Sequence, residues 1–332
     1  MRKLPRLMTA HKWFLITLFL AVFLVYLRFN QGVVQQDNYV GYAKMFPGSV
    51  GNISFFESRL FPGLPLLIYL LTFITNNYFI SGYLITLLSF VGCYVVLHKI
   101  TKSKLSFLPL IFPPIMLNLA SLIDTEFPFI FLIILGYYLL KKEKLLLAFL
   151  IIGISIWFRL AGTAVLAGIF IYFLIMKRSK DFFLNLPYFI FPVVLLLVYN
   201  AHYFGSENLF YQLFTYQALH PGRISVGVVQ LGMDLIRAVR WHWYRIFISG
   251  LFYIIFFLVL WVKSIKLKSL EFWIITGIYI FTLSINLVPF LENFGRYLAP
   301  AIPFFWTLYY KRLESMKLLY LLVPLSLLVV LI

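Results

Sequence analysis

The sequence predicts an all-α protein that crosses a membrane many times. Apolar residues make up 63% of the 332 residues, charged residues make up 12%, and the mean hydropathy is +0.95. A soluble domain of this length does not have such a composition. Repeated apolar runs with few charges are typical of transmembrane helices, because a helix satisfies its own backbone hydrogen bonds in lipid. We expect one transmembrane domain over residues 1–332.

Twelve apolar segments follow one another along the chain. The first predicts a retained signal anchor, because no small-residue cleavage site follows it. The one cysteine, Cys93, lies inside an apolar run and excludes a disulfide within the chain. The segments are 13–29, 61–75, 78–97, 105–118, 127–140, 145–158, 160–176, 182–200, 246–262, 271–288, 298–310 and 317–332.

The basic residues set the expected sidedness. The formal net charge is +17, but the lysines and arginines form short clusters between apolar runs, which the positive-inside rule explains without a nucleic-acid partner. Alternation places every cluster after residue 98 in the cytoplasm. Lys99 would lie outside if both 61–75 and 78–97 crossed, so either 61–75 or 105–118 is expected not to cross. About eleven crossings result, with the N-terminus inside and the C-terminus outside.

This topology separates the charged residue types. Four acids lie beside inner lysines and are expected to be solvated: Glu143, Asp181, Glu271 and Glu314. The outer side receives the other seven acids and eight arginines, and arginine suits bidentate contact with phosphate. The outer face is therefore expected to bind an anionic lipid or a polar substrate, unless the arginines only snorkel to headgroups. These arginines are Arg28, Arg59, Arg159, Arg223, Arg237, Arg240, Arg245 and Arg296.

Two outer loops, 30–60 and 201–245, are longer than connectors require. In the first, Tyr39, Ala43 and Phe46 recur at helical spacing, which predicts a short helix in the membrane interface, ended by Pro47-Gly48. Asp37 falls near the start of this helix, where a carboxylate also suits the helix dipole without any catalytic role.

The second long loop predicts two more short helices. One is capped by Ser206, runs to about 219 and is broken at 220–222. The other is amphipathic over about 226–240. Its polar face is lined by Gln230, Asp234, Arg237 and Trp241.

Shorter outer segments place ionisable groups at the membrane boundary, where such groups usually face a cavity. They contain Asp124, Glu126, Arg159, Glu292 and Arg296. Purely structural ion pairs, Glu126 with Arg159 or Glu292 with Arg296, remain open. The sequence contains no HExxH, CxxC, Walker-type loop or GxSxG motif, and the spacing of its histidines matches no metal motif.

The order of these motifs resembles the GT-C superfamily of membrane glycosyltransferases over roughly residues 10–310. It is most similar to the mannosyltransferases of the PIG-V type, which add the second mannose in GPI-anchor synthesis, and to their prokaryotic relatives. Where that family carries Trp-Asp, this chain has Gln36-Asp37. The motifs are, in order, QDNYVGYAKMF, SRLFPGLPLLIYL, DTEFPFIF, RLAG, FGSENLFYQLFTYQALHPGR and RYLAPAIPFFW.

The resemblance implies a GT-C-like fold and an inverting glycosyltransferase that takes a sugar, expected to be mannose, from a polyprenyl-phosphate donor. The acceptor would be a glycan, a glycolipid or a protein on the extracytoplasmic side. The enzyme would lie in the plasma membrane of a prokaryote or in the endoplasmic reticulum of a eukaryote. Asp37 matches the family's first-loop catalytic acid, which would take the proton of the acceptor hydroxyl.

Substrate binding would fall to the polar residues of the matching motifs. Arg296 first, then Arg159 and Arg223, would stabilise the leaving phosphate, so no metal or other cofactor is required. A divalent cation, Mg²⁺ or Mn²⁺, could bind if Asp37 and Glu126 lie close together. The expected substrate-binding residues are Arg59, Asp124, Glu126, Arg159, Gln217, His220, Arg223, Arg296 and Tyr297.

Two other functions remain open. A transporter or flippase of lipid-linked saccharides would also be polytopic, but such proteins often show internal repeats and broken helices at the midplane, and no clear repeat is visible here. An O-antigen-type polymerase or ligase would use a diphosphate-linked donor and has a large outer loop rich in arginine. The early Asp37 favours the GT-C interpretation.

Overall fold

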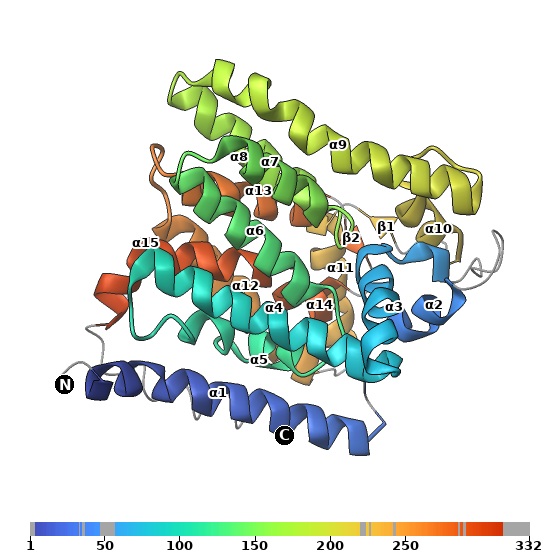
Figure 1. The fold of residues 1–332 in the computed structure, drawn as a ribbon, viewed down its shortest axis with the longest axis horizontal. Helices are drawn as coiled ribbons and strands as arrows, with labels where there is room; N and C mark the ends of the chain where they lie inside the picture. The colour runs from blue at the N-terminus through green and yellow to red at the C-terminus, as the bar shows by residue number, and fades with distance from the viewer. Residues whose placement is uncertain are drawn as a thin grey trace.

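The protein is almost entirely helical, as the sequence predicts (Figure 1). The computed structural model describes residues 4–32, 34, 37–46, 57–219, 224–225, 227–241, 244–284, 286–287 and 290–314. The expected last span, 317–332, lies outside them.

The helices of the first half are α1 (Leu4–Asn30), α2 (Tyr39–Met45), α3 (Gly63–Thr75), α4 (Tyr78–Thr101), α5 (Pro114–Ala120), α6 (Glu126–Lys141), α7 (Leu145–Ser155) and α8 (Gly162–Ile175). The second half adds α9 (Ser179–Phe204), α10 (Tyr211–Leu219), α11 (Gly227–Arg240), α12 (Tyr244–Lys263), α13 (Leu270–Ser284), α14 (Phe290–Leu298) and α15 (Ile302–Glu314). Short 3-10 turns lie at Glu57–Arg59, Leu108–Leu110 and Ala299–Ala301.

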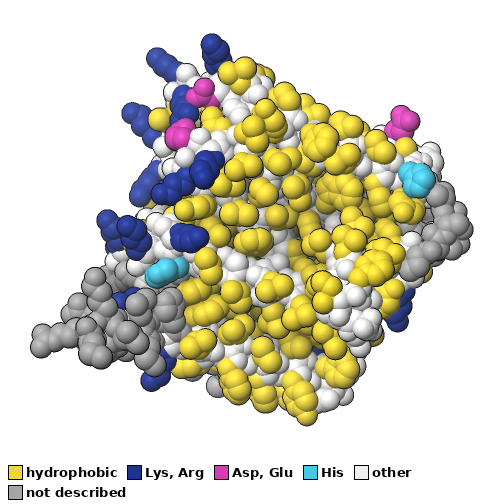
Figure 2. Space-filling view, viewed as in Figure 1, with side chains coloured by type: hydrophobic (Ala, Val, Ile, Leu, Met, Phe, Trp, Pro, Cys, Tyr) yellow, Lys and Arg dark blue, Asp and Glu magenta, His cyan; other side chains and the backbone are white. Residues whose placement is uncertain are grey.

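Two described helices, α4 and α9, are long and apolar enough to cross a membrane by length and composition. Large apolar side chains also lie on the outside of the protein, for example Phe19 on α1, Leu184 on α9 and Ile255 on α12. Figure 2 shows apolar side chains covering the face in view, with lysine and arginine gathered mainly along its left edge. The helical fold is confirmed, while the number of crossings stays a prediction.

The turns that carry the basic clusters meet at one end of the protein. Lys141 at the end of α6 contacts Glu271 at the start of α13, with the two charged atoms 2.6 Å apart. Arg178, before α9, reaches Glu143 between α6 and α7 at 2.8 Å. The hydroxyl of Tyr309 on α15 donates to the carbonyl of Lys263 at the end of α12. We call this the basic end.

The opposite end gathers the segments that the sequence places outside. The amide of Ile123 donates to the carbonyl of Val34 at 3.1 Å, and the amide of Gly63 donates to the carbonyl of Trp157 at 2.8 Å. These contacts join the segments after α1, before α6, before α3 and after α7. In Figure 1 this end, with α2, α3 and α10, lies on the right. We call it the site end.

The helices α8 and α13, which run between the two ends, pack closely against each other. A Cβ added to Gly168 on α8 would lie 2.2 Å from the carbonyl oxygen of Trp273 on α13, and one added to Gly277 would lie 2.3 Å from that of Ala164. Only glycine therefore allows α8 and α13 to approach this closely. Small residues at such crossings are typical of helices packed inside membranes.

Several predicted elements need correction. The apolar face of α2 lies in the protein rather than in an interface, because Tyr39 and Ala43 are buried and Phe46 packs on Tyr69 and Tyr203. The first helix of the second long loop starts at Tyr211, because the residues before it form a turn in which the Asn208 side chain accepts from the amide of Phe210.

Glu271 is also a correction, because it is buried rather than solvated. Its carboxylate binds Lys141 and accepts from the hydroxyls of Tyr137 and Ser269. A second feature that the sequence did not predict is a two-residue ladder, β1 (Ile224–Ser225) with β2 (Asn286–Leu287). This antiparallel pair ties the long loop 201–245 to the segment before α14.

Candidate functional site

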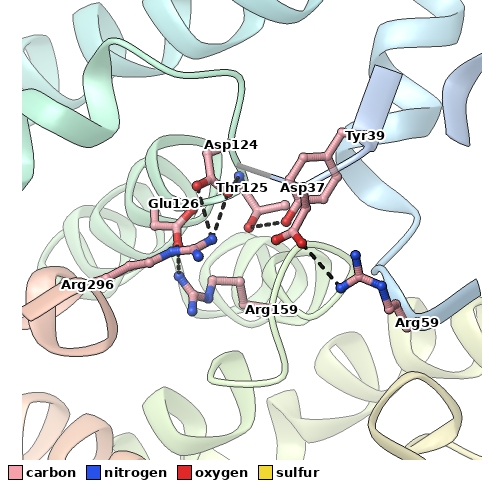
Figure 3. A network of polar contacts seen from close by, with 8 residues as sticks. All are labelled: Asp37, Tyr39, Arg59, Asp124, Thr125, Glu126, Arg159 and Arg296. Atoms are coloured by element: carbon pink, nitrogen blue, oxygen red, sulfur yellow. Dashed lines mark hydrogen bonds and ion pairs between the residues drawn. The ribbon is translucent and has the colours of Figure 1, made fainter. Parts of the chain in front are cut away.

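Two acids and two arginines from three distant segments form a largely buried cluster at the site end (Figure 3). Asp124 and Glu126 lie at the start of α6, Arg159 lies in the turn between α7 and α8, and Arg296 lies on α14. Nη2 of Arg296 lies 3.0 Å and 3.1 Å from the two carboxylate oxygens of Asp124. Oε1 of Glu126 accepts from Nε of Arg296 and, at 2.5 Å, from Nη1 of Arg159.

Local structure fixes the two acids. Oδ1 of Asp124 accepts from the amide of Thr125 at 2.7 Å, just before α6 begins. Glu126 occupies the first turn of that helix, where the unsatisfied amides and the dipole favour a negative charge. The amide of Ile123 is bound by Val34. The segment after α1 therefore helps to hold the acids in place.

Burial and ion pairing act in opposite directions on the pKa values of this cluster. The Glu126 side chain is fully buried, and that of Asp124 is 1% exposed. Burial raises the pKa of the Asp124 carboxyl. The Arg296 guanidinium acts in the opposite direction, and the Glu126 carboxylate raises the pKa further. Charges this deep are tolerated because each has a partner.

Asp37 lies beside this cluster and has its own arginine. Its Oδ1 lies 3.2 Å from Nη1 of Arg59, and its side chain remains 25% exposed. The Arg59 guanidinium also lies over the Tyr216 ring of α10, 5.9 Å from its centre. Asp37 is thus a fixed carboxylate that solvent, and hence a ligand, can reach.

Neighbouring side chains set the position of Asp37. The Asn38 side chain caps α2 by accepting from the Gly41 amide at 3.1 Å, and it donates to Oε1 of Glu57 at 2.9 Å. Gly41 leaves room for this cap, since a Cβ there would lie 2.2 Å from Nδ2 of Asn38. Because Arg59 follows Glu57 in one 3-10 turn, this turn holds both Asp37 and the residue after it.

Tyr39 connects Asp37 to the buried cluster. Its hydroxyl lies 3.5 Å from Oγ1 of Thr125, the residue between the two buried acids. Figure 3 shows Asp37 between Arg59 on one side and the Glu126 cluster on the other. The polar residues therefore form one continuous site, with Asp37 as its accessible carboxylate.

The two arginines of the cluster differ in their remaining capacity. Arg296 gives Nε and Nη2 to the two acids, and its expected role as the foremost phosphate ligand stays a prediction. Arg159 makes one such contact, through Nη1, and its guanidinium lies over the Tyr297 ring at 5.5 Å. Its side chain is 16% exposed. In the described part of the chain, its Nε and Nη2 make no further hydrogen bond.

The other predicted site residues divide into two groups. Tyr297 lies under Arg159, and Gln217 is half-buried on α10, next to Tyr216, which Arg59 contacts. His220 and Arg223 lie outside the described residues, as does the side chain of Glu292. The structural pairing of Glu126 with Arg159 that the sequence left open is observed.

Sequence reasoning missed four participants: Asn38, Tyr39, Glu57 and Thr125. Proximity to Asp37, Arg59 and the acids in the chain was the only signal for them. Among the described residues, no group of three or more histidine, cysteine, aspartate or glutamate side chains could hold a metal ion. This finding gives no support to the alternative that a divalent cation binds between Asp37 and Glu126.

Comparisons with known proteins leave the site to be judged on its own geometry. No protein-family model, no curated protein and no solved structure matches this chain.

Proposed function

We propose that the chain is a multi-pass membrane protein whose basic end faces the cytoplasm and whose site end faces outward. Three observations support this. The surface carries large exposed apolar side chains, two helices have the length and composition of membrane spans, and the lysine-rich turns gather at one end. The buried acids and arginines lie at the other end.

The contacts also suggest how about eleven crossings arise. The α3 helix has 13 residues, which rise about 20 Å, less than the roughly 30 Å of a bilayer core. Its first residue, Gly63, donates its amide to the carbonyl of Trp157 at the site end. Its last residue, Thr75, shares a hydrogen bond with the hydroxyl of Ser81. The residue after Ser81, Gly82, packs on Ile123, which also lies at the site end. Both ends of α3 thus lie at the site end, and we take α3 as the segment that does not cross.

Residues 105–120 then return from the basic end to the site as a broken segment. They comprise a 3-10 turn and the seven residues of α5. Irregular backbone at membrane depth is tolerated where protein surrounds it, and Leu105, Phe107 and Leu110 are buried. This assignment leaves Lys99 and Lys102 at the cytoplasmic side.

We further propose that the site transfers a sugar from a polyprenyl-phosphate donor to an extracytoplasmic acceptor, with inversion, as in GT-C glycosyltransferases. The observation that carries this is the position of Asp37. It is an accessible carboxylate, held by Arg59, beside a buried cluster of acids and arginines at the site end. The sugar, expected to be mannose, and the acceptor class, a glycan, glycolipid or protein, follow the motif resemblance.

In the proposed reaction, a carboxylate oxygen of Asp37 takes the proton of the acceptor hydroxyl. The acceptor oxygen bonds to the anomeric carbon as the bond from that carbon to the phosphate oxygen breaks. The phosphate leaves with the bonding electrons, and the spare donors of Arg159 can stabilise its charge. Arg59 holds the carboxylate through the ion pair between its Nη1 and Oδ1 of Asp37. A positioned base of this kind contributes roughly 10²–10⁴ in rate.

A donor screen tests the proposal. Purified protein in lipid is incubated with polyprenyl-phosphate mannose, polyprenyl-phosphate glucose or undecaprenyl-diphosphate oligosaccharide, together with membrane lipid extract as acceptor, and sugar release is measured. We expect release from a monophosphate donor. Release from the diphosphate donor alone would favour the polymerase or ligase, and saccharide movement across the bilayer without release would favour the flippase.

Asp37→Asn identifies the catalytic group in the same assay. It should reduce release roughly 10²–10⁴-fold without lowering Tm. The matched control is Asp181→Asn, which removes a carboxylate paired with Arg178 at the basic end and should leave release unchanged. Near-normal turnover by Asp37→Asn would contradict its assignment as the base.

A further inference from the structure

One oxygen of the buried cluster has no visible hydrogen-bond donor. Both arginines bind Oε1 of Glu126, and Oε2, which is fully buried, has no hydrogen-bond partner among the described residues. Buried polar atoms are nearly always paired, and an unpaired carboxylate oxygen is costly. A donor for Oε2 is therefore expected close by.

The Asp124 carboxyl, two residues before Glu126 and bound to the same arginine, can supply that donor when it is protonated. The carboxyl groups of Asp124 and Glu126 bind the same guanidinium group, that of Arg296, through Nη2 and Nε. Two ionised carboxylates in contact repel, whereas one proton between them removes the repulsion and satisfies Oε2. Glu126 binds two guanidinium groups and Asp124 binds one. Asp124 is therefore the better place for the proton.

We propose that Asp124 and Glu126 share one proton, so that the cluster they form with Arg159 and Arg296 carries one net positive charge and binds the phosphate group of a lipid-linked donor. Two arginines contribute +2 and the singly protonated acid pair contributes −1. The phosphate would bind the spare donors of Arg159. The charge state stands without the proposed function, while the identity of the lipid rests on it.

Five ionisable groups surround the acid pair. They are Asp37 in the first loop, Tyr39 on α2, Arg159 in the turn before α8, and Arg296 and Tyr297 on α14. Asp37 is balanced by Arg59, so it does not cancel the surplus charge. Loss of the shared proton as pH rises would make the cluster neutral and weaken phosphate binding.

Infrared spectroscopy tests the proton directly and needs no sugar transfer. The protein is purified in a detergent without carbonyl groups, and its spectrum at pH 7 is compared with that of Asp124→Asn. We expect a carboxylic-acid carbonyl band in the wild-type protein that the variant lacks. Identical spectra in this region would mean that Asp124 is ionised and would overturn the proposal.

Phosphate binding tests the charge and the ligand. The Tm of the wild type is measured with inorganic phosphate and with farnesyl phosphate across a pH series. We expect farnesyl phosphate to bind more tightly, its binding to weaken as pH rises, and Arg159→Gln to abolish the shift. Equal affinity for the two probes would overturn the lipid assignment, and no binding of either would overturn the anion site.

The variant Asp124→Asn separates the two charge states. With a shared proton, the variant keeps the cluster positive at every pH, so the alkaline loss of binding disappears. With four ionised groups, the wild-type cluster would be neutral at pH 7, and the variant would tighten phosphate binding by roughly tenfold or more. That tightening would contradict the proposal even if the enzyme proved to use another donor.

Discussion

The two ends of the protein hold ion pairs built from similar residues, yet their surroundings differ. At the site end, Arg296 reaches Asp124, which is 172 residues away in the chain, and their side chains are only 12% and 1% exposed. At the basic end, Arg178 joins Glu143 and the nearby Asp181, and all three are exposed. Exposed pairs contribute little to stability, whereas a buried charge depends on its partner. The location of an ion pair thus indicates its role better than its composition does.

Removing one acid at each end should give the largest contrast in stability. Glu126→Ala leaves the mostly buried guanidinium groups of Arg159 and Arg296 without their shared oxygen, which should lower the free energy of unfolding by about 3–5 kcal/mol. Glu143→Ala removes an exposed partner of Arg178 and should change the free energy of unfolding by no more than about 0.5 kcal/mol. Equilibrium unfolding in mixed micelles measures both changes. Equal losses of unfolding free energy for the two variants would show that the site-end arginines depend on their acid no more than the exposed Arg178 does.

The helices that join the two ends should be sensitive to added volume. Gly168→Ala places a methyl group 2.2 Å from the Trp273 carbonyl oxygen and should cost about 1–3 kcal/mol, because α8 and α13 must separate. The matched control is Gly232→Ala on α11, where no atom lies within 4 Å. That change should be neutral or stabilising by up to about 1 kcal/mol. A neutral Gly168→Ala would contradict the close crossing.

The smallest expected effect is a pH dependence at the basic end. A hydrogen bond from Arg178 lowers the pKa of the exposed Glu143 carboxyl from its ordinary value of 4.5. The folded pKa is the lower one, so this stabilisation is present above pH 4.5 and is lost as pH falls through the folded value. Arg178→Gln should therefore flatten the Tm profile slightly below pH 4.5, and added salt should shrink the difference. A larger change at neutral pH would argue against a solvated pair.

Much of this arrangement could be predicted from sequence, because the apolar runs and the basic clusters between them are both visible in composition. Apolar runs predicted the helices, and lysine clusters predicted which turns meet at the basic end. The ends of α6 illustrate this, with Glu126 at the site and Lys141 among the bases. The acid of the first loop and the acids before α6 were also expected on one side.

The remainder depends on contacts that no local pattern encodes. The pairing of Arg296 with Asp124 and the ladder between β1 and β2 each join segments far apart in the chain. Glu271 was expected in water because lysines surround it in the sequence, but Lys141 and Tyr137 enclose it. The apolar face of α2 was identified correctly, but nothing in the sequence distinguished a lipid contact from a protein contact.

Labelling from each side of the membrane tests the central claim most directly. In a Cys93→Ser background, Glu207→Cys places a thiol on the exposed segment between α9 and α10, and Lys142→Cys places one at the basic end. An impermeant maleimide is added to intact cells and then to permeabilised cells. We predict that Glu207→Cys is labelled in intact cells and that Lys142→Cys is labelled only after permeabilisation. The reverse pattern would place the Asp37 site in the cytoplasm and contradict transfer to an extracytoplasmic acceptor.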